Sequence, residues 1–340
     1  MKIFVTGGTG YIGSHTVVEL QKNGYDVIIA DNLVNSSLEV LDGIEKITGI
    51  RPEFEEIDLT DGEVTRDFFA RHSDIRAVIH FAALKAVGES VNKPLEYYFN
   101  NLNSLMNVLT CMREFKVPNL VFSSSCTVYG QADVLPVTEK TPRHEAESPY
   151  GNTKVMSEDI IRDLMRVEPG MRALALRYFN PIGAHPTAFI GELPNGVPNN
   201  LIPYLTQTAI GIREQLSVFG DDYNTPDGSP LRDYIDVVDL AQAHVVAIRR
   251  LLDGKNKKNY EFFNIGTGKA LSVLEIIHAF ERATGVKVNY KVVGRRAGDI
   301  EKVWADTTLA NNELGWKAVT PIEETLANAW KWQKSLEATN

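Results

Sequence analysis

A glycine-rich turn near the start of the chain constrains the fold more than any other feature. The turn reads Thr6-Gly7-Gly8-Thr9-Gly10-Tyr11-Ile12-Gly13. Residues 2–5 before it form an apolar run typical of a buried strand, and residues 14–20 after it carry apolar side chains at helical spacing. Gly8, Gly10 and Gly13 fit the pattern G-x-G-x-x-G. A turn of this kind lets a pyrophosphate approach the main chain at the positive end of a helix.

Because a glycine-rich turn can also be a plain connection, its context decides the interpretation. A second apolar run over residues 26–30 ends at Asp31. A carboxylate at that place accepts hydrogen bonds from the hydroxyls of an adenine ribose. Residues 32–35 contain no Arg or Lys that would pair with a 2′-phosphate. The sequence therefore predicts a dinucleotide site for NAD rather than NADP.

Composition limits the class of protein and its partners. A chain of 340 residues can bury a large core, which we expect to form two lobes sharing one cleft. A content of 44% hydrophobic and 23% charged residues is ordinary for a soluble globular protein. The net charge of −9 argues against nucleic acid as the main partner. Cys111 and Cys126 make neither a disulfide framework nor a metal spacing, and the 7 histidines show no paired metal spacing. We expect a cytoplasmic protein without a metal, without export and without membrane insertion, since no run reaches the ~18 apolar residues of a membrane span.

Strands and helices alternate through the first half of the chain. The pattern predicts further strands over 52–57, 76–81 and 119–123, and helices over 62–72 and 94–115. This rhythm is typical of a doubly wound parallel α/β sheet of the Rossmann type, with a ligand crevice at the carboxyl ends of the strands. Asp58 and Lys85 fall at such ends, where each is either a ligand contact near the cofactor or a surface charge.

After about residue 180 Pro and Gly become frequent, which predicts long loops over a cleft, and residues 221–230 read as another loop. We expect residues 1–180 to form the NAD-binding domain and 181–340 a smaller C-terminal α/β domain that binds the substrate. Part of about 230–265 should pack back on the first domain. Capping boxes at Ser272-x-x-Glu275 and Thr320-x-x-Glu323 predict two helix starts.

The candidate chemistry lies after the strand over 119–123. Ser125 follows it, and Tyr150 and Lys154 are spaced to lie one turn apart on a helix that begins near Pro149. A phenol has a reference pKa of about 10 and is a poor base at neutral pH. A neighbouring lysine stabilises the phenolate, and a serine hydroxyl can share the proton of a substrate alcohol. Such a trio can take a proton from an alcohol while hydride leaves its carbon for a nicotinamide.

With the glycine turn and Asp31, these residues resemble the extended short-chain dehydrogenase/reductases over essentially the whole chain. The serine, tyrosine and lysine positions of that superfamily match Ser125, Tyr150 and Lys154. Its nucleotide-sugar 4,6-dehydratases have an Asp-Glu pair directly after the serine or threonine of this strand, and its decarboxylases have a Glu there. Here the two positions are Cys126 and Thr127, and we give Cys126 no catalytic role.

The resemblance is closest to the nucleotide-sugar 4-epimerases, through residues 31–33, 81–85, 101–104, 123–130, 176–181, 198–201, 232–235 and 295–299. It implies that hydride leaves C4 of a UDP-hexose, that the 4-keto sugar rotates about its pyrophosphate tether, and that hydride returns to the other face. UDP-galactose and UDP-glucose would interconvert while NAD stays bound. The family also suggests a homodimer through the helices around 94–115 and 150–168, and no membrane partner.

The same resemblance implies the binding residues. The positions that match cofactor contacts are Gly7, Gly10, Tyr11, Ile12, Gly13, Asp31, Asn32, Asn35, Ser36, Asp58, Leu59, Phe81, Ala82, Ala83, Lys85, Asn101, Ser123, Tyr150, Lys154 and Tyr178. The positions that match substrate contacts are Lys85, Ser125, Thr127, Tyr150, Phe179, Asn180, Asn200, Leu201, Phe219, Arg232, Tyr234, Arg296, Asp299 and Val303.

Individual roles follow from the family positions. Tyr178 would contact the nicotinamide ribose region, and Asn180, Asn200 and Leu201 would hold the UDP moiety. Arg232 and Arg296 would grip the pyrophosphate, a task that suits guanidinium groups. Asp299 would bind the uridine ribose and Phe219 would pack against uracil. A loop-stabilising role is the alternative for each of these residues.

Val303 departs from the pattern of epimerases restricted to plain hexoses, which carry a tyrosine there beside the sugar C2 group. Enzymes of the family that also accept N-acetylated sugars carry a smaller residue. We therefore expect turnover of UDP-GlcNAc and UDP-GalNAc as well, unless neighbouring side chains fill the space.

Three other functions stay open at this stage. A UDP-uronic acid 4-epimerase shares the Ser125, Tyr150 and Lys154 core. A non-catalytic NAD(H)-sensing protein can use the same fold, although such proteins tend to lose the tyrosine or the lysine. An ordinary dehydrogenase would release NADH in each turnover.

Overall fold

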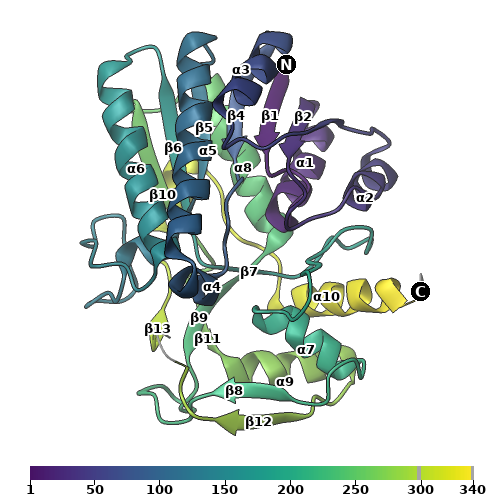
Figure 1. Ribbon diagram of the computed structural model, residues 1–340. Helices are drawn as coiled ribbons and strands as arrows, with labels where there is room; N and C mark the ends of the chain where they lie inside the picture. The colour runs from purple at the N-terminus through teal and green to yellow at the C-terminus, as the bar shows by residue number, and fades with distance from the viewer. Residues whose placement is uncertain (297–299, 338–340) are drawn as a thin grey trace.

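A parallel sheet of seven strands forms the larger lobe of the computed structural model, which describes residues 1–296 and 300–337 (Figure 1). Its order is β10-β6-β5-β4-β1-β2-β3. The strands are β1 (Lys2–Thr6), β2 (Asp26–Asp31), β3 (Glu53–Glu56), β4 (Ile75–His80), β5 (Asn119–Ser125), β6 (Arg172–Tyr178) and β10 (Tyr260–Ile265). The order reverses between β1 and β4, which places the ligand crevice at the carboxyl ends of these two strands. The predicted fold class is confirmed.

Helices cover both faces of this sheet, because alternate strand residues are apolar on each side. Ile3, Val5 and Ile29 pack in one cluster against α1 (Tyr11–Lys22), α2 (Glu39–Thr48) and α8 (Val237–Leu252). Phe4, Ile28 and Val78 pack in the other cluster against α3 (Gly62–Arg71), α5 (Pro94–Glu114) and α6 (Pro149–Val167). The short helix α4 (Val87–Asn92) precedes α5.

The strand before the candidate chemistry is longer than the sequence pattern predicts. It continues past Ser123 to Ser125, because Ser123, Ser124 and Ser125 pair with Leu176, Arg177 and Tyr178 of β6. Ser125 is thus the last residue of a buried parallel strand, and it caps the short helix η1 (Cys126–Tyr129). The third strand is shorter than expected and spans only Glu53–Glu56.

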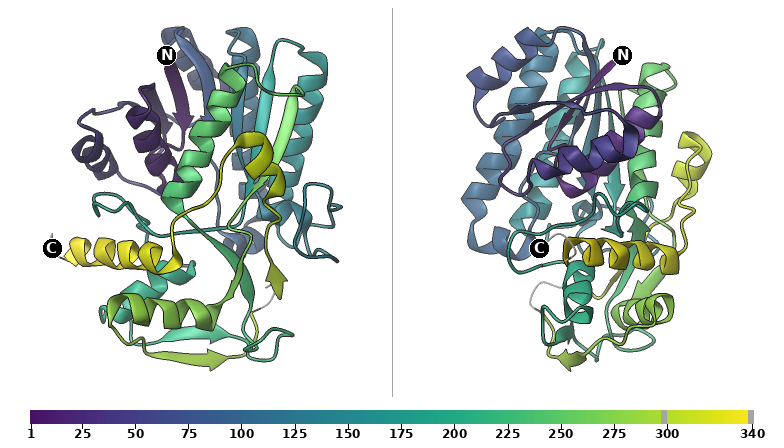
Figure 2. Two further views of the ribbon diagram at one scale, coloured as in Figure 1. Left: turned by 180° about the vertical axis from the view of Figure 1, so that it is seen from behind. Right: turned by 90° about the vertical axis from the view of Figure 1, so that its right-hand side faces the viewer.

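The smaller lobe holds two further sheets and three helices. β7 (Asn180–Ile182), β9 (Leu231–Asp236), β11 (Ala270–Ser272) and β13 (Lys302–Val303) form one sheet, and β8 (Leu216–Phe219) pairs with β12 (Tyr290–Val293). The helices are α7 (Leu201–Ala209), α9 (Val273–Thr284) and α10 (Ile322–Glu337). Before α10, η2 (Ala310–Leu314) packs on the larger lobe against α8 and β10. Between β9 and β11 the chain returns to the larger lobe as α8 and β10 (Figure 2).

Local signals for helix starts and loops are largely confirmed in the smaller lobe. Ser272 and Glu275 form the reciprocal capping box at the start of α9. Residues 221–230 form a loop, and α10 begins at Ile322, two residues after Thr320. Across the helices of the described ranges, we find none with the length and apolarity that crossing a bilayer requires.

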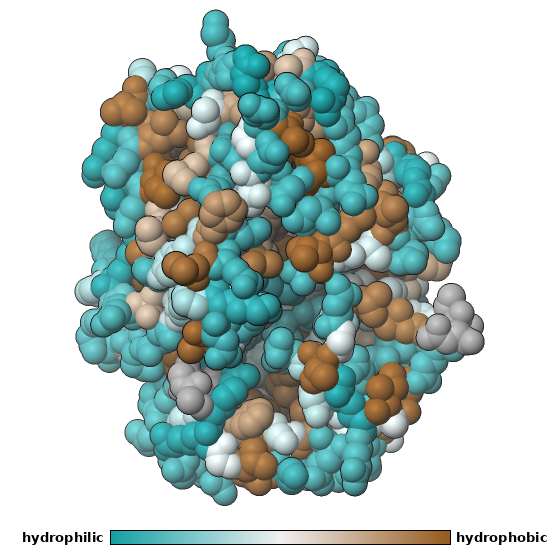
Figure 3. All heavy atoms as spheres, in the orientation of Figure 1, coloured by the Kyte–Doolittle hydropathy of each residue, from teal (hydrophilic) through white to brown (hydrophobic). Residues whose placement is uncertain are grey.

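Apolar side chains are exposed along α4 and α5, on the face shown in Figure 3. Leu95 and Phe99 are 81% and 62% exposed, and Val87, Val91 and Met106 are exposed beside them. A row of this kind on neighbouring helices is unusual for a monomer surface.

A buried ion pair joins α6 to β5 and β6 behind the candidate chemistry. The Glu158 carboxylate is fully buried and accepts two hydrogen bonds from Arg177, from Nε at 2.9 Å and from Nη2 at 2.6 Å. Ser124 Oγ donates to it at 2.5 Å, and Arg143 donates as well. Burial alone would raise the pKa of Glu158, but the hydrogen bonds and charges of Arg177 and Arg143 hold that pKa below its ordinary value.

Replacing Glu158 by Gln should lower the free energy of unfolding by about 3–5 kcal/mol, because it leaves the Arg177 guanidinium buried without its counter-charge. The matched control is Glu114→Gln, which breaks an exposed pair with Arg66. That change should cost less than about 1 kcal/mol. Urea denaturation of both variants measures the difference, and equal losses would contradict a special role for the buried pair.

Candidate active site

The glycine turn is built so that a ligand can approach its backbone. Gly7 has φ +66°, and an added Cβ would lie 2.8 Å from the Ala82 backbone nitrogen. At Gly13 an added Cβ would lie 2.3 Å from the Gly7 carbonyl oxygen. Gly10 stands at the N-cap of α1, and Tyr11 and Ile12 open that helix. The turn therefore presents the N-terminus of α1 at the carboxyl edge of β1, as a pyrophosphate site requires.

The residues expected around an adenine ribose lie together beyond β2. Asp31 ends the strand and accepts hydrogen bonds from the backbone N–H of Thr9 at 3.3 Å and of Leu33 at 2.9 Å. Ser36 Oγ is 3.4 Å from the same carboxylate. Asn32 and Asn35 belong to this loop. The Asp31 carboxylate thus connects the glycine turn to its own loop, and its contact with an adenine ribose stays a prediction.

Asp58 and Leu59 follow β3, the neighbour of β2, and lie at the same carboxyl edge of the sheet. The Asp58 carboxylate accepts hydrogen bonds from Thr60, from the backbone N–H at 2.9 Å and from the hydroxyl at 2.8 Å. These bonds stabilise its own turn, and the position of that turn near an adenine stays a prediction.

A third group of expected cofactor contacts follows β4. Phe81, Ala82 and Ala83 continue directly from the strand, with Lys85 beyond them. Asn101 of α5 fixes this loop, because its side chain accepts from Leu84 N at 2.8 Å and donates to Leu84 O at 3.0 Å. It also donates to Thr153 Oγ1 of α6 at 3.1 Å. Asn101 thus has a structural task that connects the loop to the helix of Tyr150 and Lys154.

Ser125, Tyr150 and Lys154 converge at the carboxyl ends of β5 and β6. Tyr150 is in the first turn of α6, and Lys154 follows one turn later on the same face. Lys154 Nζ is buried, lies 5.8 Å from the centre of the Tyr150 ring and donates to the Ser123 carbonyl at 2.7 Å. Ser125 Oγ accepts from Thr127 N at 3.2 Å. The hydroxyls of Ser123 and Tyr178 form a short hydrogen bond beside them.

Burial governs the protonation of this trio. It raises the pKa of the Tyr150 phenol above its ordinary value, against a hydrogen bond with Ser125 that lowers it. Burial also lowers the pKa of Lys154 to about 8, against the charge of Glu158 that raises it. Desolvation is the largest influence on the Tyr150 phenol in the protein without ligands, and the expected lowering of its pKa by Lys154 stays a prediction. The N-terminus of α6, at Tyr150, favours the phenolate.

Apart from Lys85, Ser125, Thr127 and Tyr150, the expected substrate residues that the structure describes lie in or next to elements of the smaller lobe. Phe179 and Asn180 lead into β7, and Asn180 pairs with Tyr234 of β9. Asn200 is the N-cap of α7, and Leu201 is the first residue of that helix. Phe219 ends β8, and the Arg296 guanidinium lies 5.6 Å from the centre of its ring. Arg232 of β9 donates to the carbonyls of Leu231 at 2.9 Å and of Ile300 at 2.5 Å. Asp299 falls outside the described residues.

Val303 lies close to η1, the short helix that directly follows Ser125 at the end of β5. It pairs with Arg232 of β9 and packs in a cluster with Val128 and Phe179, against Cys126. Burial raises the pKa of the Cys126 thiol to about 12, which agrees with a role as a buried small side chain. Thr127 Oγ1 is buried and has no hydrogen-bond partner among the described residues. A polar atom in this position is available to a ligand.

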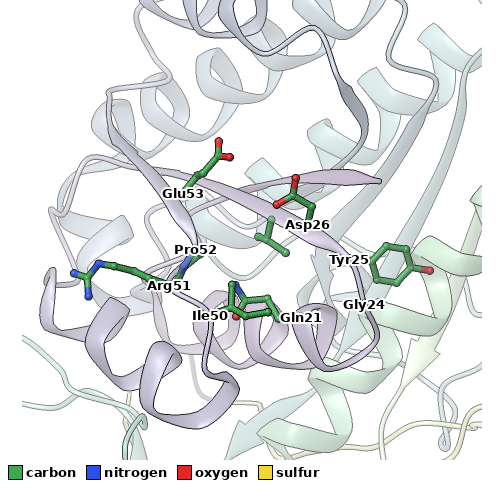
Figure 4. A pocket seen from close by; sticks show the side chains of 9 residues that line it. Gln21, Gly24, Tyr25, Asp26, Ile50, Arg51, Pro52 and Glu53 are labelled. Atoms are coloured by element: carbon green, nitrogen blue, oxygen red, sulfur yellow. The ribbon is translucent and has the colours of Figure 1, made fainter.

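A pocket elsewhere on the larger lobe contains none of the expected site residues. Gln21, Tyr25, Arg51 and Glu53 are among its lining residues (Figure 4). Asp26 and Glu53, the first residues of β2 and β3, place it at the amino edge of the sheet, opposite to the glycine turn.

Sequence reasoning missed Glu158, Arg177 as its partner, and Glu192. Glu158 follows Lys154 by one helical turn, so its spacing was a signal of contact with the same site. Glu192 has no such local signal. Its carboxylate lies 3.4 Å from Nζ of Lys85, which is far from it in sequence, and 2.6 Å from Nδ2 of Asn200, which is eight positions further along the chain.

Comparisons with known proteins agree with this geometry. The model of the NAD dependent epimerase/dehydratase family matches residues 3–266. The UDP-glucose 4-epimerase of Bacillus subtilis (strain 168) is 51% identical over 335 residues, which is 98% of this chain and 97% of that protein.

Two solved structures are similar over nearly the full length. One is the UDP-glucose-4-epimerase of Stenotrophomonas maltophila with bound NAD and formylated UDP-arabinopyranose, with a TM-score of 0.96, 46% identity and complete coverage of both chains. The other is the UDP-glucose 4-epimerase of Bifidobacterium longum in complex with NAD⁺ and UDP, with a TM-score of 0.94, 45% identity and 98% coverage of both chains.

Substituting Gly7 by Ala should strip the purified protein of most of its NAD, because the new Cβ would collide with the Ala82 backbone and displace the turn. Gly49→Ala is the matched control. Gly49 has φ +75° but open space around its Cβ direction, so this variant carries the backbone strain of about 1 kcal/mol or more without the collision. Quantifying the nucleotide released on denaturation measures retention. Full NAD occupancy in Gly7→Ala would show that the turn does not contact the cofactor.

Proposed function

This chain belongs to the NAD dependent epimerase/dehydratase family, and we propose that it interconverts UDP-galactose and UDP-glucose by inverting C4 of the sugar. The observation that carries the proposal is the convergence of Ser125, Tyr150 and Lys154 beside a glycine turn with the geometry of a dinucleotide site. The larger lobe binds NAD, and the smaller lobe binds the UDP part of the substrate.

The proton chemistry belongs to Tyr150. Its hydroxyl is near enough to the Ser125 hydroxyl for Ser125 to lower the Tyr150 pKa, so the two can hold the C4 hydroxyl of a sugar and remove its proton. Bound NAD accepts the hydride from C4 and returns it, and its positively charged nicotinamide also favours the phenolate form of Tyr150. Lys154, fixed by the Ser123 carbonyl, adds a further positive charge on the same face of α6. The Tyr150 proton then returns to the sugar oxygen when the keto group is reduced.

Inversion requires that the keto sugar turns over while its nucleotide stays anchored. Asn180, Asn200, Leu201, Phe219, Arg232 and Arg296 are the proposed anchor for UDP, with Asp299 as a further contact. All described members of this set lie on the smaller lobe, so the anchor is separate from the elements that hold the cofactor. At the two positions after Ser125, Cys126 and Thr127 offer no carboxylate, and this agrees with a reaction that ends in reduction rather than elimination.

Replacing Tyr150 by Phe should lower kcat for UDP-galactose conversion by about 10²–10⁴-fold, the usual contribution of a general acid–base group. NAD retention should stay near that of the wild type. Tyr25→Phe, at the opposite edge of the sheet, is the control and should leave kcat unchanged. A coupled assay of UDP-glucose formation measures both variants, and an undiminished rate in Tyr150→Phe would refute the proposed mechanism.

We also propose that the enzyme converts UDP-GlcNAc and UDP-GalNAc, because Val303 is small and lies beside Phe179 and the catalytic strand. Val303 is only 4% exposed, so a tyrosine there would have to occupy neighbouring space. Val303→Tyr should lose UDP-GalNAc turnover and keep UDP-galactose turnover, while Val303→Ile should retain both. Absence of UDP-GalNAc turnover in the wild type would eliminate this part of the proposal.

A cytoplasmic homodimer through α5 and α6 is the proposed assembly, supported by the exposed Leu95 and Phe99 on α5. Phe99→Asp should shift the mass in solution from dimer to monomer, because the interface would bury an unpaired charge. Val64→Asp changes an exposed apolar residue on α3 and should leave the dimer intact. A monomeric wild type in light scattering would contradict this assembly.

A further inference from the structure

The segment 183–200, which we name the strap, connects β7 to α7 and contacts both lobes. It contains no helix and no strand of more than a single bridge pair. Figures 1 and 2 show it passing between α2 of the larger lobe and α10 of the smaller lobe. Among the described residues, the strap thus lies between the two lobes. The larger lobe carries the residues proposed to bind NAD (the NAD half-site), and the smaller lobe carries those proposed to bind UDP (the UDP half-site).

The larger lobe holds the first part of the strap firmly. Tyr11 donates its hydroxyl to the Gly183 carbonyl at 2.7 Å, and Tyr11 belongs to the glycine turn. Ile190 is 2% exposed and packs in the apolar cluster of α1 and α2. The approach to α2 is so close that a Cβ on Gly43 would lie 2.4 Å from the Phe189 carbonyl oxygen. Further along, Asn195 Nδ2 donates to the Val34 carbonyl of the Asp31 loop at 3.3 Å.

Helix α10 holds the strap from the opposite side. Trp332 Nε1 donates to the backbone carbonyl of Glu192 at 3.0 Å. The indole ring covers Gly191, where an added Cβ would lie 2.5 Å from it. Lys331 Nζ donates to the Pro186 carbonyl at 2.7 Å. The backbone at Glu192 therefore has little freedom, and its side chain is directed by both lobes.

The Glu192 carboxylate bridges one residue from each proposed half-site. Its Oε1 is 3.4 Å from Lys85 Nζ, on the loop after β4, and 2.6 Å from Asn200 Nδ2, at the N-cap of α7. The Glu192 side chain is 10% exposed, whereas that of Lys85 is 54% exposed. One carboxylate oxygen thus orients a cation proposed to face the cofactor and an amide proposed to hold UDP.

We propose that Glu192 is a positioning residue that couples the NAD half-site to the UDP half-site. This inference rests on the proposed function, because it takes Lys85 and Asn200 as binding residues. When bound UDP fixes the Asn200 side chain, the hydrogen bond from Asn200 also fixes the Glu192 carboxylate. Glu192 then keeps Lys85 in its position near the cofactor. Coupling of this kind is reciprocal in binding free energy, so UDP must strengthen NAD binding by the same free energy by which NAD strengthens UDP binding. We expect this tighter binding to show as slower NAD release.

The test measures exchange of bound NAD in the purified holoenzyme, with and without saturating UDP. The protein is mixed with an excess of isotopically labelled NAD, and the nucleotide released on denaturation is analysed by mass spectrometry. In the wild type, UDP should slow the exchange by about tenfold, within the usual range of coupling between sites. In Glu192→Ala the slowing should fall below about twofold, and the Kd for UDP should rise by about tenfold.

Two variants separate coupling from damage to the fold. Glu192→Gln keeps the shape and an oxygen acceptor for Asn200 but removes the charge that attracts Lys85, so it should lose part of the slowing and bind UDP nearly as tightly as the wild type. Glu324→Gln removes an exposed carboxylate of α10 and should behave as the wild type.

The inference is overturned if UDP slows NAD exchange in Glu192→Ala as strongly as in the wild type, or if UDP has no effect in the wild type. A wild-type protein that contains no NAD or does not interconvert the UDP-hexoses would instead refute the proposed function. Should Glu192→Ala not fold, Glu192→Gln and Trp332→Phe, which removes the N–H to the Glu192 carbonyl, answer the same question.

Discussion

The hydrogen bond from the Lys154 ammonium to the Ser123 carbonyl, 2.7 Å long and fully buried, is the contact on which the site depends. It joins α6 to the carboxyl end of β5, so Tyr150 on the helix and Ser125 on the strand have fixed positions relative to each other. One helical turn further on, Glu158 makes a second connection through Ser124 and Arg177. Two adjacent strand residues are thus tied to one helix at successive turns, and the reactive hydroxyls lie at the open end of that rigid unit.

In this site, desolvation and nearby charges act in opposite directions on the pKa of Tyr150. Burial raises the pKa of Tyr150 and lowers that of Lys154 to about 8, so the empty protein does not favour the phenolate. The hydrogen bond to Ser125 and the N-terminus of α6 act in the opposite direction. A positively charged nicotinamide adds to them once NAD is bound. In the mechanism proposed above, Tyr150 is therefore the strongest base when the cofactor is present and oxidised, which would couple proton removal to hydride acceptance in one site.

The sequence predicted β1 to β5 of the larger lobe, because these strands follow local rules: apolar runs, helical periodicity and a glycine turn with Asp31 at the next strand end. It did not predict β6 and β10 as strands of the same sheet. The resemblance of Ser125, Tyr150 and Lys154 to a known family supplied the chemistry, and the structure places these three together. The boundary of β5 was missed because its last two residues are serines, which no apolar pattern extends to. Pairing with β6 decides that boundary. The role of Glu192 could not be predicted from the sequence, because its contacts with Lys85 and Asn200 depend on how α10 and the strap pack between the lobes.

In the proposed reaction, one bound NAD accepts hydride from C4 and returns it to the opposite face of the same sugar. Tyr150 removes the proton of the C4 hydroxyl and then returns it. UDP-galactose carrying deuterium at C4 tests it directly, with the UDP-glucose product analysed by mass spectrometry and NMR after the reaction in ordinary water. We predict that deuterium is retained at C4 of UDP-glucose, because the hydride carried by the bound cofactor does not exchange with solvent hydrogen. Replacement of that deuterium by solvent hydrogen would contradict the account, because it would mean that C4 is inverted by exchange with water.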